Sequence, residues 1–358
     1  MCAGYKGLYP ERNINMKSIK RIVALMCMML LLMCVCACNK QDGGDNTNNS
    51  ESVGNGEDFQ DNPGEDEVDI EIIPTGTFLE EDEIETTPEE TTPPPSSDAT
   101  FNYVVEEAGV AIVGLAEGVS TEEIIIPATI ENAAVVRIAD EAFRHNETLK
   151  SIVLPEGMLS IGAKAFDDCS ALESVVISET VAQIGNGAFS KCSALTEITI
   201  PESVTIIGTS VFADCSALEK IELNEGLTTI GAYAFSGCTA LEAIELPNTV
   251  TTLGSCAFYH CEALKDVALS NQIVTVEFGT FMYCKLLQKI SLPDSIEKIE
   301  HKVFAECINL KEVYVADTLT FMEKDVFEAC TLVTIMTPDE AYAAKWAAEH
   351  GVKQRNYY

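Results

Sequence analysis

A phenylalanine recurs every 23 residues from the middle of the chain to near its end. The register is unbroken at nine positions: Phe143, Phe166, Phe189, Phe212, Phe235, Phe258, Phe281, Phe304 and Phe327. Self-similarity at a fixed period is the signature of a repeat architecture. This period constrains the fold more strongly than any other feature of the sequence.

Each Phe lies within a constant pattern that reads L-x-x-I-x-[LI]-[P/x]-x-x-V-x-x-I-G-x-x-A-F-x-x-C-x-x. The short apolar alternation predicts a strand, while Gly and Phe suit a turn and an inward-pointing plug. One unit cannot bury its own apolar side, but stacked units cover one another. We therefore predict a β-rich repeat solenoid with parallel strands stacked one per 23-residue coil. A long helix is excluded because Pro, Gly and β-branched residues punctuate every unit.

The repeat also resembles a known family. The string C-x-x-L-x-x-I-x-L-P-x-x-V-x-x-I-G-x-x-A-F, visible from Cys192 through Pro201 and Gly208 to Cys215, resembles the BspA-like bacterial leucine-rich repeat family. The resemblance runs from about Phe101 to the C-terminus. It implies a leucine-rich repeat solenoid on a bacterial surface, and some members of that family are adhesins for host matrix proteins or other cells.

The composition bounds the partners. The net charge is −35, which disfavours nucleic acid and anionic membrane surfaces because like charges repel. Five of the 14 cysteines lie at or before Cys38, and eight of the others occupy one repeat position. We interpret those eight as a ladder of buried free thiols, since side chains that point the same way give poor disulfide torsions. Asn146 takes the first position of the ladder.

The N-terminal segment 1–38 is predicted to be a signal peptide with a lipobox. Met16 is a possible true start, because basic residues and the apolar run 22–37 follow it. Val35-Cys36-Ala37-Cys38 resembles a lipobox, which makes Cys38 the predicted lipidation site and the membrane anchor. Cys34 and Cys36 are rival sites, and an ordinary secretory signal or an uncleaved anchor are the alternatives.

The remaining chain divides into four predicted parts. Segment 39–100 is acidic and rich in Thr and Pro, so we expect a disordered tether. Segment 101–140 is expected to form an N-terminal β cap, with strands at 101–105, 110–113 and 124–127. The solenoid follows at 141–336. Segment 337–358 is predicted to be a C-terminal cap helix, with a capping box at Thr337-Pro338-Asp339-Glu340 and Trp346 plugging the last coil.

A second period is superimposed on the first. Proline occurs at one repeat position in alternate units, where the intervening units carry another residue; the prolines are Pro155, Pro201, Pro247 and Pro293, and the intervening residues are Ser178, Asn224, Ser270 and Ala316. The unit that was duplicated is therefore interpreted as a pair of coils.

The sequence carries no recognisable motif for catalysis or metal binding. The four histidines stand far apart, and none has the spacing of a zinc site. We therefore expect no enzyme activity, no cofactor and no metal. Cys256 lies outside the ladder, near His260 and Cys261; a reactive or metal-binding role competes with a tolerated surface substitution.

Binding is the predicted role of the strand side chains that point outward. One such residue per coil forms the candidate binding face: Val153, Val176, Thr199, Glu222, Glu245, Ala268, Ser291 and Tyr314. Glu219, Glu222, Glu242 and Glu245 fall on adjacent coils. They form either a patch for a basic partner or Ca²⁺, or a solvated face relieved by Lys220 and Lys265.

The predicted function is adhesin-like. We expect a monomeric, lipid-anchored protein on the outer side of the cell that binds a protein or glycoconjugate on host or neighbouring cells. The alternative is a non-catalytic envelope scaffold or receptor component that binds a partner from its own cell. Fold alone does not decide between them, since repeat solenoids have many partners.

Overall fold

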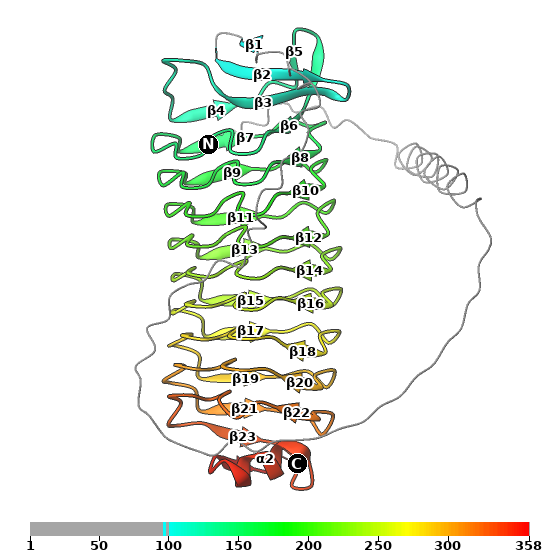
Figure 1. Cartoon of the computed structure of the whole chain (residues 1–358), viewed down its shortest axis with the longest axis vertical. Coiled ribbons are helices and arrows are strands. Elements are labelled where there is room, and N and C mark those ends of the chain that lie inside the picture. Colours follow the sequence, from blue (N-terminus) through cyan, green and yellow to red (C-terminus); the bar gives the residue numbers. More distant parts are fainter. Residues whose placement is uncertain (1–95, 98–99, 358) are drawn as a thin grey trace, which may run out of the picture. The chain divides into compact units, whose positions relative to one another are not determined.

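The computed structural model describes residues 96–97 and 100–357. In this part the coils follow one another as a stack that ends in a helix (Figure 1). Equivalent residues of neighbouring coils, 23 positions apart, pair as parallel strands, as Thr199 does with Glu222. The predicted repeat solenoid is confirmed. The predicted signal peptide, the lipidation site Cys38 and the tether up to residue 95 lie outside the described residues.

The N-terminal part is a small set of strands that covers the first coil. β2 and β3 form an antiparallel hairpin, β3 continues in parallel to β6, and β4 pairs in parallel with β7. The three strands predicted here are confirmed as β2, β3 and β4. The bounds are β1 Ser96–Ser97, β2 Phe101–Glu106, β3 Gly109–Leu115, β4 Glu123–Ile125, β5 Thr129–Ile130 and β6 Ala133–Ile138.

Each coil from β7 to β22 then contributes one strand of three residues and one strand of two, and the last coil contributes β23 alone; the two-residue strands were not predicted. We call the outward side of β4 and the three-residue strands the long-strand face, and the outward side of the two-residue strands the short-strand face. The three-residue strands are β7 Ser151–Val153, β9 Ser174–Val176, β11 Glu197–Thr199, β13 Lys220–Glu222, β15 Ala243–Glu245, β17 Asp266–Ala268, β19 Lys289–Ser291, β21 Glu312–Tyr314 and β23 Thr334–Met336. The two-residue strands are β8 Ser160–Ile161, β10 Gln183–Ile184, β12 Ile206–Ile207, β14 Thr229–Ile230, β16 Thr252–Leu253, β18 Thr275–Val276, β20 Lys298–Ile299 and β22 Phe321–Met322.

The column of phenylalanines forms the centre of the core. All nine rings are buried, and successive rings stack with centroids 5.2–5.7 Å apart and planes within 9° of parallel. These separations fit offset stacking of aromatic rings. The repeat Leu residues, such as Leu218 and Leu241, are fully buried beside them. Each coil thus covers the apolar side of its neighbour.

The cysteine ladder lies in the same interior. Seven of its thiols are buried and Cys330 is half-buried, so the predicted buried position is confirmed. Each Sγ donates a hydrogen bond to the backbone carbonyl of a Phe 26 residues earlier, at 2.9–3.3 Å. Asn146 satisfies backbone groups instead, because its Oδ1 accepts from the N–H groups of Thr148 and Leu149.

The turns around each Phe use left-handed backbone at two positions. Residues two before and two after each Phe, except Asp325 before Phe327, have φ near +60°, and most of them are not glycine, as Tyr233 and Ala329 show. The glycine of the I-G motif has another role. A Cβ at Gly185 would lie 2.4 Å from the backbone N of Ala163 in the previous coil, so the stack itself requires glycine there.

The C-terminal end is closed by α2 Tyr342–Glu349 and by β24 Lys353–Arg355, which pairs with β23. The predicted capping box is wrong. The N-cap is Ala341, which makes no side-chain cap bond, and the Thr337 hydroxyl, which lies before the helix, is buried without a hydrogen-bond partner. Trp346 is the predicted core plug: it is buried, meets Phe327 edge-to-face and donates to the Met322 carbonyl at 3.0 Å.

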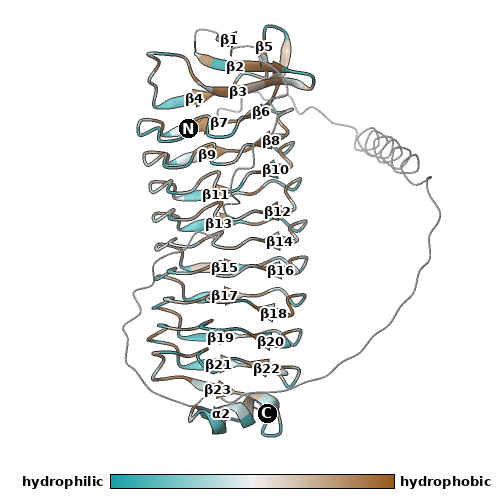
Figure 2. Ribbon diagram, viewed as in Figure 1, coloured by the Kyte–Doolittle hydropathy of each residue, from teal (hydrophilic) through white to brown (hydrophobic). Residues whose placement is uncertain are grey.

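Among the described residues no helix is both long and apolar enough to cross a membrane. The helix whose bounds are given above, α2, has eight residues. Figure 2 shows how polarity differs among the strands. β2 and β3 are coloured mainly as hydrophobic, whereas β11 and β13 carry hydrophilic colour.

Candidate functional site

The eight predicted outward residues all occupy the third position of a long strand, on the long-strand face. Seven of them are exposed and Tyr314 is half-buried. Adjacent members are in direct register where their strands pair, as for Val153 with Val176 and Ser291 with Tyr314. The face is therefore a straight column of one side chain per coil.

The N-terminal end of this column is apolar. Val153 and Val176 are 37% and 56% exposed, and Ile125 of β4, in register with Val153, is 76% exposed. Sequence reasoning did not include Ile125, although Ile124-Ile125-Ile126 matches the strand pattern one unit earlier. Three neighbouring exposed β-branched side chains form an apolar patch, and contiguous patches mark interaction surfaces.

The middle of the column is acidic. Lys220 forms an ion pair with Glu222 at 2.5 Å, which lowers the pKa of Glu222, and Lys265 forms one with Glu242 at 2.8 Å. The two lysines thus pair with two of the four predicted carboxylates. Within residues 100–357, no ion pair involves Glu245. Exposed pairs of this kind contribute little to stability.

The C-terminal end is closed by an aromatic contact. Tyr314 meets Tyr357 edge-to-face with ring centroids 5.9 Å apart, and its hydroxyl donates to Glu312 Oε2 at 3.1 Å. Part of the Tyr314 surface is therefore covered by the end of the chain. The freely exposed part of the column extends from Ile125 to Ser291.

The sheet beneath this column is interrupted three times. β7 pairs with β9, β11 with β13 and β15 with β17, but no backbone hydrogen bond in the described residues joins β9 to β11, β13 to β15 or β17 to β19. Each interruption follows a coil that lacks the repeat proline and has Ser178, Asn224 or Ser270 there. The interruption is confined to the three-residue strands, since β14 and β16 of the coils beside the β13–β15 interruption pair with each other.

Asn224 shows how the second coil of a pair is tied to the first. Its Nδ2 donates to the carbonyls of Pro201 and Val204, both in the preceding coil, at 2.7 and 2.9 Å. Its Oδ1 accepts from the backbone N–H of Gly226 at 2.7 Å. All of these bonds lie on one side of the interruption between β13 and β15.

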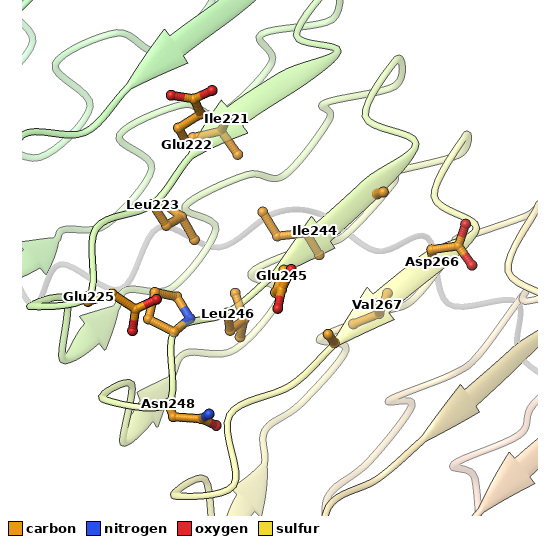
Figure 3. A pocket seen from close by; sticks show the side chains of 13 residues that line it. Ile221, Glu222, Leu223, Glu225, Ile244, Glu245, Leu246, Asn248, Asp266 and Val267 are labelled. Carbon is orange, nitrogen blue, oxygen red and sulfur yellow. The ribbon is translucent and has the colours of Figure 1, made fainter.

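A groove lies at that interruption (Figure 3), with a volume of about 650 Å³. Its floor is apolar, because Ile221 and Leu223 are half-buried where the equivalent Ile198 and Ile200 are buried. Its walls carry Glu222, and also the carboxylates of Glu225, Glu245 and Asp266, which form no ion pair in the described chain. Glu225 and Asp266 were missed by sequence reasoning, since they lie outside the single outward position considered.

The other interruptions differ in their charge. The groove between β9 and β11, about 460 Å³, includes Lys220, and that between β17 and β19, about 280 Å³, includes Lys289. No Lys or Arg lines the groove between β13 and β15. This groove alone of the three therefore presents carboxylates without a cation in its lining.

The remaining polar side chains include histidines that contact acidic groups. No group of three or more His, Cys, Asp or Glu in the described part of the chain is placed to hold a metal ion. His145 contacts Asp168, and His301 contacts Glu323 and Asp325, in each case across neighbouring coils. Burial raises the pKa of the Cys215 thiol to about 12, so this ladder cysteine is protonated at neutral pH.

Cys256 is buried, at 3% exposure, which corrects its interpretation as a surface substitution. It occupies the left-handed position two residues before Phe258, and its Sγ lies beside Tyr233 and Gly279 at the same position of the neighbouring coils. Burial raises the pKa of its thiol, and the effect outweighs the hydrogen bond with Tyr233. A thiol that is harder to ionise is a poorer nucleophile, so the reactive role is disfavoured.

Several of the solved structures that resemble the chain are bacterial leucine-rich repeat proteins. A leucine-rich cell surface protein of Faecalibacterium prausnitzii A2-165 is 22% identical, with 72% of this chain and 97% of that chain covered and a TM-score of 0.34. The Treponema pallidum leucine-rich repeat protein TpLRR is 22% identical (73% and 98% covered, TM-score 0.43). The pneumococcal vaccine antigen PcpA is 15% identical (74% and 98% covered, TM-score 0.40). These likenesses do not bear on what the chain binds.

The family comparison is more direct. No curated protein matches the chain. The family model described as "BspA type Leucine rich repeat region" matches six copies over residues 117–242 and 205–334, more than half of the chain. Members are bacterial cell-surface proteins whose repeats generally bind proteins, and no enzyme family is indicated. This chain belongs to the BspA type leucine-rich repeat family.

Proposed function

We propose that this protein is anchored to the membrane through a lipid on Cys38 and binds a protein on host or neighbouring cells through its long-strand face. The observation that carries the proposal is the exposed column on that face, apolar at Ile125, Val153 and Val176 and acidic at Glu222 and Glu245. A column with two chemically distinct parts can select a partner by both contact area and charge.

The apolar part supplies affinity in this proposal. Burying exposed apolar surface contributes roughly 25 cal/mol per Å², and Ile125 is the most exposed large hydrophobic residue among those described. The acidic part supplies orientation, because rim charges mainly change the association rate and the choice of partner. Both parts are fixed on strands, so little entropy is lost when a partner docks.

The anchor and the tether give this face its reach. A lipidated Cys38 carries two acyl chains, which anchor stably where a single chain would not. In this proposal the tether ends before β1, and an ideal coil as long as segment 39–95 extends by roughly 40 Å (root mean square). Cys38→Ala is expected to abolish palmitate labelling and release the protein or leave its precursor, and labelling that persists would contradict the anchor.

The test compares two substitutions, one on each face, that both replace an exposed apolar residue with Asp. Val176→Asp on the long-strand face and Ile206→Asp on the short-strand face replace residues of similar exposure, 56% and 53%. The full-length chain in mild detergent is titrated onto arrays of extracellular-matrix proteins and of envelope proteins from its own cell. We expect saturable binding that Val176→Asp weakens by about tenfold, a cost of about 1.4 kcal/mol, and Ile206→Asp leaves unchanged.

The arms of this test separate the alternatives. Equal effects of the two substitutions would contradict a role for the long-strand face. Binding only to envelope proteins of the same cell would favour the scaffold alternative. Binding lost when the glycans of the target are removed would assign the partner to the glycoconjugates.

A further inference from the structure

At the interruption between β13 and β15, the backbone groups that join strands within a pair of coils are not hydrogen-bonded to each other. In the pair β11 and β13, the Ile200 N–H donates to the Glu222 carbonyl at 2.9 Å. The equivalent groups across the interruption are the Leu223 N–H and the Glu245 carbonyl, and no hydrogen bond joins them. Unjoined edges of this kind are templates for an extended chain, which can add backbone hydrogen bonds to them.

The groove at these edges has the size and the composition of a peptide site. Its volume, about 650 Å³, lies within the range of roughly 300–1,000 Å³ that is usual for ligand sites. Ile221 and Leu223 form an apolar floor, and Figure 3 shows the side chains of Glu222, Glu225 and Glu245 along the groove. An extended chain places alternate side chains on opposite sides, so one set can meet the floor and the other the carboxylates.

The charge decides which chain would fit. Glu225, Glu245 and Asp266 have no ion-pair partner among the described residues, and no Lys or Arg lines this groove. Among the carboxylates of the groove, only Glu222 has an ion-pair partner, which is the exposed Lys220 on the same strand, β13. Unrelieved carboxylates on neighbouring strands repel one another, and a cationic ligand removes that repulsion.

We propose that the groove between β13 and β15 binds an extended segment of a partner protein in which Lys or Arg alternates with apolar residues. The inference deepens the proposed function and rests on it. The segment lies along the unjoined edges of β13 and β15, its apolar side chains contact Ile221 and Leu223, and its cationic groups pair with Glu222 and Glu245.

The test uses a defined probe, a fluorescein-labelled peptide of five Lys-Val repeats, titrated with the full-length chain in mild detergent. Fluorescence anisotropy reports the binding. The double variant Glu222→Gln/Glu245→Gln removes two charges from the groove. The control variant Glu156→Gln/Asp294→Asn removes two exposed charges from turns in other coils and changes the net charge equally. Circular dichroism melts confirm that both variants fold.

We expect saturable binding that the groove variant weakens by about tenfold and the control variant by less than about twofold. A probe with N-methylated valines, which cannot donate those backbone hydrogen bonds, should bind about fivefold more weakly, as strand addition requires. Equal losses in the two variants, or equal affinity of the methylated probe, would overturn the inference in favour of unspecific attraction to an acidic surface. Absence of saturable binding would overturn it as well.

This outcome is separable from the proposed function. If a natural partner binds through Val176 but is insensitive to the groove variant, the peptide site is wrong and the binding face stands. If the groove binds the probe but Val176→Asp has no effect on any natural partner, the peptide site stands and the wider face is wrong.

Discussion

Phe235 is fully buried and stacks on Phe212 and Phe258 with centroid distances of 5.6 and 5.5 Å. It therefore contacts a neighbouring coil on each side, and its removal would open a cavity between two stacked units. The 23-residue period predicted this position as an inward plug, because only a shared interior explains an unbroken register of bulky residues.

Phe235→Ala should lower the free energy of unfolding by about 3–5 kcal/mol, because the cavity adds to the lost transfer energy. The matched control is Phe278→Ala, since Phe278 is 40% exposed and surface changes stay within about 0.5 kcal/mol. Urea denaturation followed by circular dichroism measures both. Similar losses for the two variants would contradict a shared core centred on the repeat phenylalanines.

Other residues could not be placed from their type alone. Cys256 breaks the repeat pattern, which favours a surface position, yet its side chain is buried between Tyr233 and Gly279 of the neighbouring coils. The outward position of Glu222 was predicted, but its ion pair with Lys220 of the same strand and its hydrogen bond from Thr199 of the neighbouring coil depend on side-chain geometry. Periodicity places a residue on a face and does not choose its partner.

At the scale of elements, the turns are where the left-handed backbone strain is concentrated. Residues two after each Phe adopt φ near +60°, and seven such positions between Phe143 and Phe304 are not glycine: His145, Asp168, Lys191, Asp214, His260, Tyr283 and Glu306. Left-handed backbone costs a residue with a Cβ roughly 1–2 kcal/mol. The stack supports this strain through backbone bonds between coils, such as that from His145 N–H to the Asp167 carbonyl at 2.8 Å.

Ala329 offers a direct test of that strain, because it is exposed and has φ of +60°. Ala329→Gly should raise the free energy of unfolding by up to about 1 kcal/mol, as the strain is relieved. Ala243→Gly, in the extended strand β15, should lower it by about 0.5–1 kcal/mol, because glycine there loses more entropy on folding. Thermal melts of the two variants should therefore shift in opposite directions, and shifts of the same sign would contradict the assignment of strain to the turns.

The strand elements illustrate what sequence pattern can and cannot predict. The three-residue strands follow from the alternation I-x-[LI], but the two-residue strands carry a weaker signal of one apolar residue before Gly. The interruption between β13 and β15 has no local signal, since both strands have the same pattern. Only the alternation of proline with residues such as Asn224 marks the pairs of coils. Hydrogen bonding between identical units depends on small displacements that identical patterns cannot encode.

At the scale of the whole described part, one interior serves every coil while the two faces differ. The long-strand face carries the exposed column from Ile125 to Ser291, with its apolar end and its acidic groove. The short-strand face carries isolated exposed apolar residues, Ile206 and Phe321, and the exposed Leu159 and Val274 directly precede β8 and β18 beside it. In repeat proteins the extended face is the usual binding surface, since stacking leaves it ordered and open. The central functional claim is therefore that the long-strand face binds the partner and the short-strand face does not.

Photo-crosslinking on living cells tests whether the two faces differ in binding, and it does not require the partner to be known beforehand. A benzophenone amino acid replaces Val153 or Ser291 on the long-strand face, and Leu159 or Val274 on the short-strand side as matched exposed controls. After irradiation in the presence of target cells, mass spectrometry identifies the crosslinked proteins. The account predicts partner crosslinks from Val153 and Ser291 and none above background from Leu159 and Val274. Crosslinks that arise only from Leu159 and Val274 would contradict it.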